Sequence, residues 1–196
     1  NKWFNDVKDY CLLENCFAEN DQSHQKRLEE AELLILSPGI PRDHVILGPI
    51  YKNQIPIWGE IELAYRVLKE HQINLPIVAI TGTNGKTTTT TFLGEVLKTC
   101  GYHPFIGGNI GIPFCDMAYE VISQKITYTH IVLELSSFQL ESTSEFHPQI
   151  AIVLNIFQNH GERYDQISDY ANAKFNIALK MNEDDTVIIP SDFPLI

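Results

Sequence analysis

Short, almost continuously apolar runs recur through the second part of the chain, and polar or glycine-rich segments separate them. The runs are Ile77–Ile80, Ile131–Leu135, Ile150–Leu154 and Thr186–Ile189. Short runs without polar–apolar alternation are typical of strands buried on both faces. Residues 87–100 and 168–181 are expected to be helical. Strands that alternate with helices predict an α/β fold with a mainly parallel sheet.

The first part of the chain shows weaker patterns. Two short apolar runs, Leu33–Leu36 and Ile55–Trp58, are expected to be strands, and residues 20–32 a helix or a solvated loop. Apolar side chains recur at helical spacing from Glu60 to His71, and Pro76 ends that pattern. We therefore expect a boundary near residues 70–76, with one domain over residues 1–72 and another over residues 73–196.

The most specific motif is Thr81-Gly82-Thr83-Asn84-Gly85-Lys86-Thr87-Thr88, between an apolar strand and a predicted helix. This is the context of a phosphate-binding loop, here in a shorter G-x-x-G-K-T form, because Ile80 stands where the commonest spacing has glycine. Gly82 and Gly85 allow main-chain N–H groups to face a phosphate, and the helix N-terminus adds its dipole. We expect Lys86 to bind the β- and γ-phosphates of ATP and Thr87 to bind Mg²⁺.

Glu134 lies inside an apolar strand, at the edge of the sheet where the phosphate loop is expected. A buried carboxylate needs a partner, and Mg²⁺ is the natural one beside a phosphate loop. The alternative is a glutamate in a structural salt bridge. Ser136 or Ser137 is expected to cap a following helix. His160 is either a metal ligand or acid–base group, or a solvated loop histidine. From the residues alone, Lys174 is interpreted as a surface lysine.

Composition narrows the functional class. Hydrophobic residues make up 44% and charged residues 20% of the 196 residues, and the formal net charge is −11. A strongly acidic chain argues against nucleic-acid binding, although a locally positive site can still hold a nucleotide. The four cysteines form no zinc or C-x-x-C pattern. With no apolar run long enough for a membrane helix and no secretory signal at its start, the chain is expected to be cytoplasmic.

Several motifs together resemble the Mur ligase family, the ATP-dependent amino-acid ligases of peptidoglycan synthesis. The motifs are the phosphate loop, Gly107–Gly111 followed by Pro113, Glu134–Leu140, Ser37–Pro41 and Gly59–Leu63, and the resemblance covers about residues 31–190. The branch that adds D-glutamate is the most similar. The resemblance implies a Rossmann-like UDP-binding domain, present here in part, followed by an ATPase domain that is also incomplete. It also implies a C-terminal amino-acid-binding domain that this chain lacks.

The resemblance also implies an activity and site residues. ATP would phosphorylate the carboxylate of UDP-N-acetylmuramoyl-L-alanine, and the amine of D-glutamate would attack the acyl phosphate. The enzyme is expected to be a monomer. Thr87 and Glu134 would bind one Mg²⁺ and His160 a second, with Lys174 carbamylated by CO₂ as a further ligand. Ser37, Pro38, Gly39, Asn109 and Ser136 would contact the UDP-sugar substrate.

One residue departs from the family pattern, and other functions remain open. Asn159 stands where the family often has aspartate before the histidine, so a carboxylate near the metals is missing. The alternatives are a folylpolyglutamate-type or other Mur-type ligase, another phosphate-loop enzyme such as a kinase, and an inactive nucleotide-binding module.

Overall fold

The computed structural model describes residues 23–158, 161 and 163–191. These residues form two compact units. One unit comprises residues 23–34 and 42–56, and the other comprises residues 35–41 and the described residues from 57 onwards. The second unit carries the phosphate loop and nearly all of the residues expected to be functional.

The smaller unit is helical. It contains α2 (Ser23–Glu30), the 3₁₀ turn η2 (Val45–Leu47) and α3 (Gly48–Lys52). The side chain of Asn53 donates to the carbonyl of Glu29 and so links the ends of α3 and α2. Residues 20–32, expected to be a helix or a loop, therefore contain a helix. The two short strands β1 (Leu34–Ile35) and β2 (Ile57–Trp58) pair in a separate two-stranded sheet.

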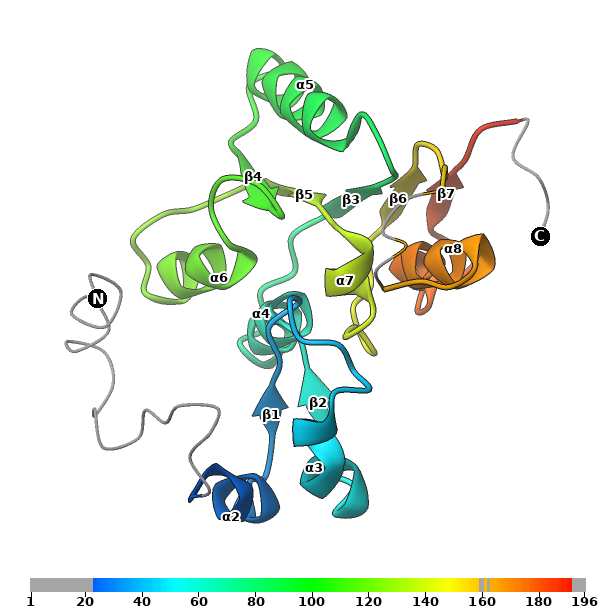
Figure 1. The fold of residues 1–196 in the computed structure, drawn as a ribbon. Coiled ribbons are helices and arrows are strands. Elements are labelled where there is room, and N and C mark those ends of the chain that lie inside the picture. Colours follow the sequence, from blue (N-terminus) through cyan, green and yellow to red (C-terminus); the bar gives the residue numbers. More distant parts are fainter. Residues whose placement is uncertain (1–22, 159–160, 162, 192–196) are drawn as a thin grey trace, which may run out of the picture. The chain divides into compact units, whose positions relative to one another are not determined.

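A five-stranded sheet organises the larger unit (Figure 1). Its strands are β3 (Ile77–Thr81), β4 (Pro104–Gly108), β5 (His130–Glu134), β6 (Ile150–Val153) and β7 (Thr186–Ile188). Their order is β4-β5-β3-β6-β7, and every pairing is parallel. The predicted parallel sheet is confirmed. Because β3 is the central strand, the loop that follows it emerges between the carboxyl ends of β5 and β6.

Helices cover both faces of this sheet (Figure 1). They are α4 (Glu60–Glu70), α5 (Lys86–Thr99), α6 (Phe114–Ile122), α7 (Ser137–Leu140), α8 (Ile167–Phe175) and the 3₁₀ turn η3 (Asn176–Ala178). Successive residues of a strand point to opposite faces. On β3, Val78 and Ile80 pack with Leu93 and Leu97 of α5. Residues Ile77 and Ala79 instead join the larger core, together with apolar side chains of α4 and α6.

Helix α4 is held to the sheet unit by a buried carboxylate. Glu62 is fully buried, and its two oxygens accept hydrogen bonds from the main-chain N–H groups of Ser144, Glu145 and Phe146 at 2.8–3.1 Å. Arg66 donates to the same carboxylate from the next turn of the helix, at 2.6 Å. Burial raises the pKa of Glu62, but these hydrogen bonds outweigh burial and hold it below its usual value.

Most predicted elements are present, and the differences have local causes. Strand β4, which ends in two glycines, and helix α6 were not predicted. The helix predicted over residues 168–181 ends earlier, at Phe175, and continues as a 3₁₀ turn. The division into domains at residue 72 stays a prediction. No helix in the described part of the chain is long and apolar enough to cross a membrane.

Candidate nucleotide-binding site

The loop after β3 has the backbone geometry that its sequence predicts. Gly82 and Gly85 adopt φ angles of 153° and 84°, which residues with a Cβ rarely adopt. A Cβ on Gly82 would also lie 3.0 Å from the Cβ of Leu154 on the neighbouring β6 segment. Glycine at position 82 is therefore required both by the turn and by the close approach of the next strand.

Asn155, two residues after the end of β6, fixes the loop through paired hydrogen bonds. Its side-chain oxygen accepts from the N–H of Asn84 at 2.9 Å, and its side-chain nitrogen donates to the carbonyl of Asn84 at 3.1 Å. The Asn155 carbonyl also accepts from the N–H of Thr83 at 2.9 Å. The Thr83 hydroxyl accepts from the N–H of Phe157. The loop thus has a defined conformation set by the neighbouring strand.

Helix α5 begins at Lys86 directly behind the loop, with Gly85 as its N-cap and no side-chain cap. The first N–H groups of a helix have no partner within the helix, so this end is suited to an anion. The ammonium of Lys86 folds back over the loop and donates to the carbonyls of Gly82 and Thr83 at 2.9 and 3.0 Å. A positive charge and several helix N–H groups therefore meet at the carboxyl end of β3.

Glu134 closes the other side of this site. The side chain is 2% exposed, and one of its oxygens accepts from the Thr87 hydroxyl at 2.8 Å. The other oxygen accepts from the side-chain amide of Asn109 at 2.9 Å. Glu134 forms no ion pair with any residue that the structure describes. A nearly buried carboxylate with two neutral partners and no cation fits a Mg²⁺ ligand.

The Gly107–Gly108 pair brings Asn109 to Glu134. Gly108 has a φ of 102°, and a Cβ there would lie 2.5 Å from the carbonyl oxygen of Glu134. A Cβ on Gly107 would lie 2.3 Å from the carbonyl oxygen of Ile112. The N–H of Asn109 donates to the Glu134 carbonyl at 2.8 Å. Two adjacent glycines thus let the end of β4 lie directly against the end of β5.

Lys174 of α8 also contacts the phosphate loop. It is 1% exposed, and its Nζ donates to the carbonyl of Gly82 at 3.0 Å and lies over the ring of Tyr170. Burial, and to a lesser extent the nearby ammonium of Lys86, lowers the pKa of Lys174 to about 7. The interpretation of Lys174 as a surface lysine is therefore wrong, and a substantial fraction of its amine is uncharged near neutral pH.

The remaining predicted residues lie in three places. Ser136 caps α7: its hydroxyl accepts from the N–H of Gln139, and the Gln139 side chain accepts from the Ser136 N–H, forming a capping box. Ser37, Pro38 and Gly39 form a turn that contacts the β6–α8 connection through Arg163. His160 lies outside the described residues, as does Asn159.

The comparisons with known proteins agree with this geometry. A family model described as the Mur ligase middle domain matches residues 80–196. The chain belongs to the Mur ligase family. It is 42% identical over 166 residues to a UDP-N-acetylmuramoylalanine–D-glutamate ligase of Citrifermentans bemidjiense. These residues make up 85% of this chain and 35% of the relative. The corresponding ligase of Streptococcus pneumoniae is 40% identical over 181 residues, or 91% of this chain and 38% of the relative.

Solved structures support the fold. A crystal structure of MurF ligase from Thermotoga maritima in complex with ADP matches with a TM-score of 0.53 at 18% identity, over 85% of this chain and 47% of that one. The UDP-N-acetylmuramate:L-alanyl-γ-D-glutamyl-meso-diaminopimelate ligase from Neisseria meningitides matches with a TM-score of 0.52 at 16% identity, over 86% of this chain and 55% of that one. This Mur ligase chain spans about a third of the length of the curated relatives that it matches.

Several residues of this Mur ligase site had no predicted role. Asn155 and Tyr170 are two of them, and the Tyr170 hydroxyl lies 3.3 Å from that of Thr83. The position of Asn155 at the carboxyl end of a buried strand was the signal that could have identified it. Arg163 and Glu141 carried no such signal, because both look like ordinary surface charges in the sequence.

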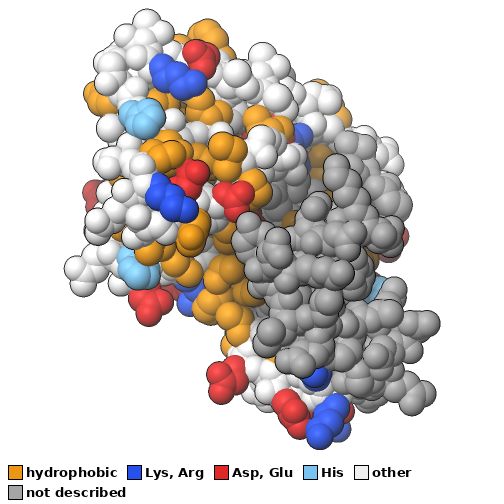
Figure 2. Space-filling model, turned by 90° about the vertical axis from the view of Figure 1, so that its left-hand side faces the viewer, with side chains coloured by type: hydrophobic (Ala, Val, Ile, Leu, Met, Phe, Trp, Pro, Cys, Tyr) orange, Lys and Arg blue, Asp and Glu red, His pale blue; other side chains and the backbone are white. Residues whose placement is uncertain are grey.

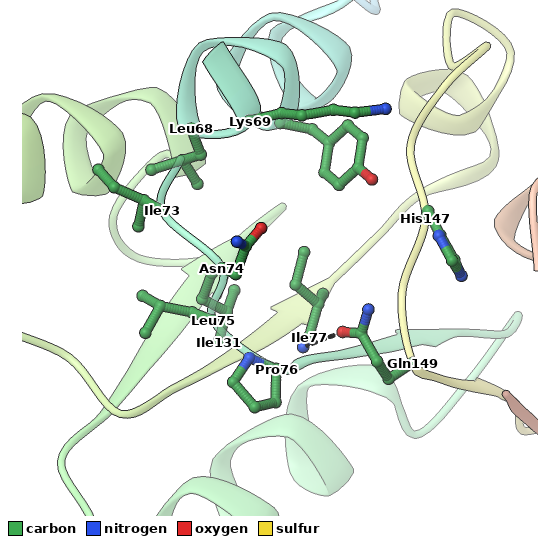
Figure 3. A pocket seen from close by; sticks show the side chains of 11 residues that line it. Leu68, Lys69, Ile73, Asn74, Leu75, Pro76, Ile77, Ile131, His147 and Gln149 are labelled. Atoms are coloured by element: carbon green, nitrogen blue, oxygen red, sulfur yellow. Dashed lines mark hydrogen bonds between the residues drawn. The ribbon is translucent and has the colours of Figure 1, made fainter. Parts of the chain in front are cut away.

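A cavity of about 320 Å³ lies elsewhere in the Mur ligase chain, at the amino ends of β3 and β5 (Figure 3). Leu68 and Lys69 of α4 lie on one side of it, and Ile77 and Gln149 lie on the other. It is at the end of the sheet opposite the phosphate loop and offers no helix N-terminus. On the face drawn in Figure 2, acidic and basic side chains of the described residues are interspersed. The cavity does not compete with the loop as the nucleotide site.

Proposed function

We propose that this chain supplies the ATP- and UDP-substrate-binding parts of a ligase that adds D-glutamate to UDP-N-acetylmuramoyl-L-alanine. The observation that carries the proposal is the meeting of Lys86, Thr87 and Glu134 around the N-terminus of α5. The similarity to relatives named as this ligase gives the substrate class. Metabolites of this kind belong to the cytoplasm, where we place the protein.

The chain's own residues account for the handling of ATP. The helix N-terminus and the Lys86 ammonium would bind the phosphates and stabilise charge during phosphoryl transfer. Thr87 and Glu134 would hold Mg²⁺, which supplies positive charge opposite the phosphate oxygens when bound. His160 would serve a second ion.

The proposed reaction has two steps. An oxygen of the substrate carboxylate attacks the γ-phosphorus of ATP, so that a new O–P bond forms as the bond to ADP breaks. The amine of D-glutamate then attacks the acyl carbon, a C–N bond forms, phosphate leaves and the nitrogen loses a proton. Asn109, which donates to Glu134, and Ser136, two residues after Glu134, would orient the UDP-linked substrate. Ser37, Pro38 and Gly39 would contact its diphosphate.

Lys174 is proposed to be carbamylated. Its uncharged amine would attack CO₂ through the nitrogen lone pair, form an N–C bond and release a proton, so that a cation becomes an anion beside the loop. The pKa of about 7 makes the reacting amine available at neutral pH. Exposure of the protein to ¹³C-labelled CO₂ should give a carbamate carbon signal that Lys174→Met abolishes.

Calorimetric titration with a non-hydrolysable ATP analogue and Mg²⁺ tests the proposal. Lys86→Ala should weaken binding by about tenfold or more, which corresponds to about 1.4 kcal/mol. Lys98→Ala is the matched control, because Lys98 is on the same helix but pairs with Glu95 on the exposed surface. Equal effects of the two substitutions, or no binding by the folded wild-type chain, would reject the nucleotide site. Binding of UDP-N-acetylmuramoyl-L-alanine then tests the substrate.

A further inference from the structure

The turn at Ser37–Pro41 has few groups with which to anchor itself. It follows the buried Leu36, whose N–H donates to the carbonyl of Trp58, and it closes through a hydrogen bond from the Ile40 N–H to the Ser37 carbonyl at 3.0 Å. Proline has no N–H, so Pro38 and Pro41 cannot donate. The carbonyls of the turn are therefore its main points of attachment.

Arg163 binds two of these carbonyls. Its Nη1 donates to the Pro38 carbonyl at 3.1 Å, and its Nη2 donates to the Ile40 carbonyl at 3.5 Å. Arg163 is more than 120 residues away in the sequence, in the connection between β6 and α8. Two contacts from one rigid guanidinium restrain the rotation of the turn as well as its distance.

The guanidinium is itself fixed by other residues. Nε and Nη2 of Arg163 donate to the two oxygens of Glu141 at 3.3 and 2.5 Å, and only 12% of the arginine and 16% of the glutamate side chain are exposed. The Phe138 ring lies 4.6 Å from the guanidinium carbon. The Tyr164 hydroxyl donates to Glu141 at 2.5 Å. Each nitrogen of Arg163 thus has a partner, and the orientation of its fork is determined.

These partners belong to segments that also build the nucleotide site. Glu141 directly follows α7, whose N-cap Ser136 lies two residues after Glu134. The β6–α8 connection that carries Arg163 also carries Asn155 and Phe157, which hydrogen-bond the phosphate loop. Arg163 therefore joins the turn to the two segments nearest the reacting groups.

We propose that Arg163 is a positioning residue that, held by Glu141, sets the Ser37–Pro41 turn in the orientation that receives the diphosphate of the UDP-linked substrate. The inference rests on the proposed function and adds to it a residue pair that contacts neither nucleotide nor sugar. The arginine acts through the turn, so its loss should affect the UDP-linked ligand and leave ATP binding intact.

The experiment measures two affinities on the whole chain, for UDP-N-acetylmuramoyl-L-alanine and for a non-hydrolysable ATP analogue with Mg²⁺. Arg163→Ala should weaken the first by about tenfold or more and change the second by less than about twofold. Arg163→Lys should recover part of the loss, because it restores the charge beside Glu141 but not the planar fork. Amide hydrogen exchange of Ile40, measured without ligand, should accelerate in Arg163→Ala.

Arg66→Ala is the matched control. Arg66 also pairs with a buried carboxylate, Glu62, and stacks on an aromatic ring, that of Trp58, but it donates to neither Pro38 nor Ile40. It should lower stability without selective loss of the UDP-linked ligand. Equal binding by wild type and Arg163→Ala, or unchanged exchange of Ile40, would overturn the proposal. Failure of the folded wild-type chain to bind the UDP-linked ligand would instead reject the proposed function, and with it the diphosphate at this turn.

Discussion

The hydroxyl of Thr87 donates to Oε2 of Glu134 at 2.8 Å, although the two residues are 47 positions apart in the sequence. Thr87 lies in the first turn of the helix behind the phosphate loop, and Glu134 ends the neighbouring strand. The contact exists because β3 and β5 pair in parallel with Ile80 beside Glu134. The sheet register thus sets the distance between the two groups proposed to hold one Mg²⁺.

Glu134→Gln should remove the effect of Mg²⁺ on nucleotide binding. The amide keeps a similar shape and can still hydrogen-bond Thr87 or Asn109, but it lacks the charge that a divalent cation needs. In calorimetric titrations, affinity for an ATP analogue with Mg²⁺ should fall about tenfold, while affinity without Mg²⁺ should change little. A variant that keeps the full wild-type response to Mg²⁺ would rule out Glu134 as a ligand.

Asn155→Ala should weaken nucleotide binding and destabilise the protein together. It removes two hydrogen bonds to Asn84, worth about 1–3 kcal/mol in all. Asn155→Asp is the informative comparison, because it keeps the acceptor for the Asn84 N–H and loses the donor. Urea unfolding and titration with the ATP analogue should rank the wild type first, the aspartate variant second and the alanine variant last. Any other order would contradict the assigned role of Asn155.

Lys174 should make the free energy of unfolding increase as the pH rises above neutral. Its folded-state pKa is about 7, below the ordinary 10.5, so between these values the unfolded chain binds more protons at this residue. The free energy of unfolding should therefore rise with pH across this window, by at most about 1.4 kcal/mol per pH unit. Below the lower value the burial penalty on the charged amine is present in full.

The measurement is a series of urea unfolding curves in CO₂-free buffer for the wild type and Lys174→Met. The difference between the two proteins isolates Lys174 from other titrating groups. The wild type should gain on the variant as pH rises from about 7 towards 10.5. If the difference in unfolding free energy between the two proteins stayed constant across that range, burial would not lower the pKa of Lys174.

Gly108→Ala should be far more damaging than Gly101→Ala. Both glycines have positive φ angles, 102° and 85°, so alanine costs about 1–2 kcal/mol of backbone strain at either position. A Cβ at Gly101 meets open space, whereas one at Gly108 would lie 2.5 Å from the Glu134 carbonyl oxygen. Unfolding curves should show a loss of about 3–5 kcal/mol for Gly108→Ala. Similar losses of unfolding free energy for the two variants would mean that β4 shifts at little cost to relieve the contact with the Glu134 carbonyl.

The sequence predicts the parts of this site that follow from short-range rules. The strand before the loop, the glycines within it and the helix after it are local features, and the structure confirms each of them. Glu134 stands out in the sequence because a charge inside an apolar run is unusual, and its role as a metal ligand stays a prediction. The burial of Lys174 was not predicted from residue pattern alone, since it depends on the packing of α8 that brings its amine to the Gly82 carbonyl, 92 residues earlier, which no local rule specifies.

The contacts made by Arg163 could not be predicted for the same reason. Its partners, Glu141 and the carbonyls of Pro38 and Ile40, come from two segments that are far from it and from each other in the sequence. Every residue has a main-chain carbonyl, so the residue type does not show which carbonyl accepts a hydrogen bond. Two of the four hydrogen bonds of Arg163 therefore cannot be predicted from the sequence. Glu62 is similar, because the groups that it binds are backbone amides of Ser144, Glu145 and Phe146.

The central position of β3 has a consequence for the order in which the molecule can be built. The phosphate loop is fixed by Asn155, which lies 71 residues after Asn84, and its strand gains its second neighbour only when β6 is present. During synthesis on the ribosome, which proceeds from the N-terminus, the loop stays without its clamp until that later strand emerges. A nascent chain that ends before Asn155 should therefore not retain nucleotide, however completely its phosphate-loop motif has been translated.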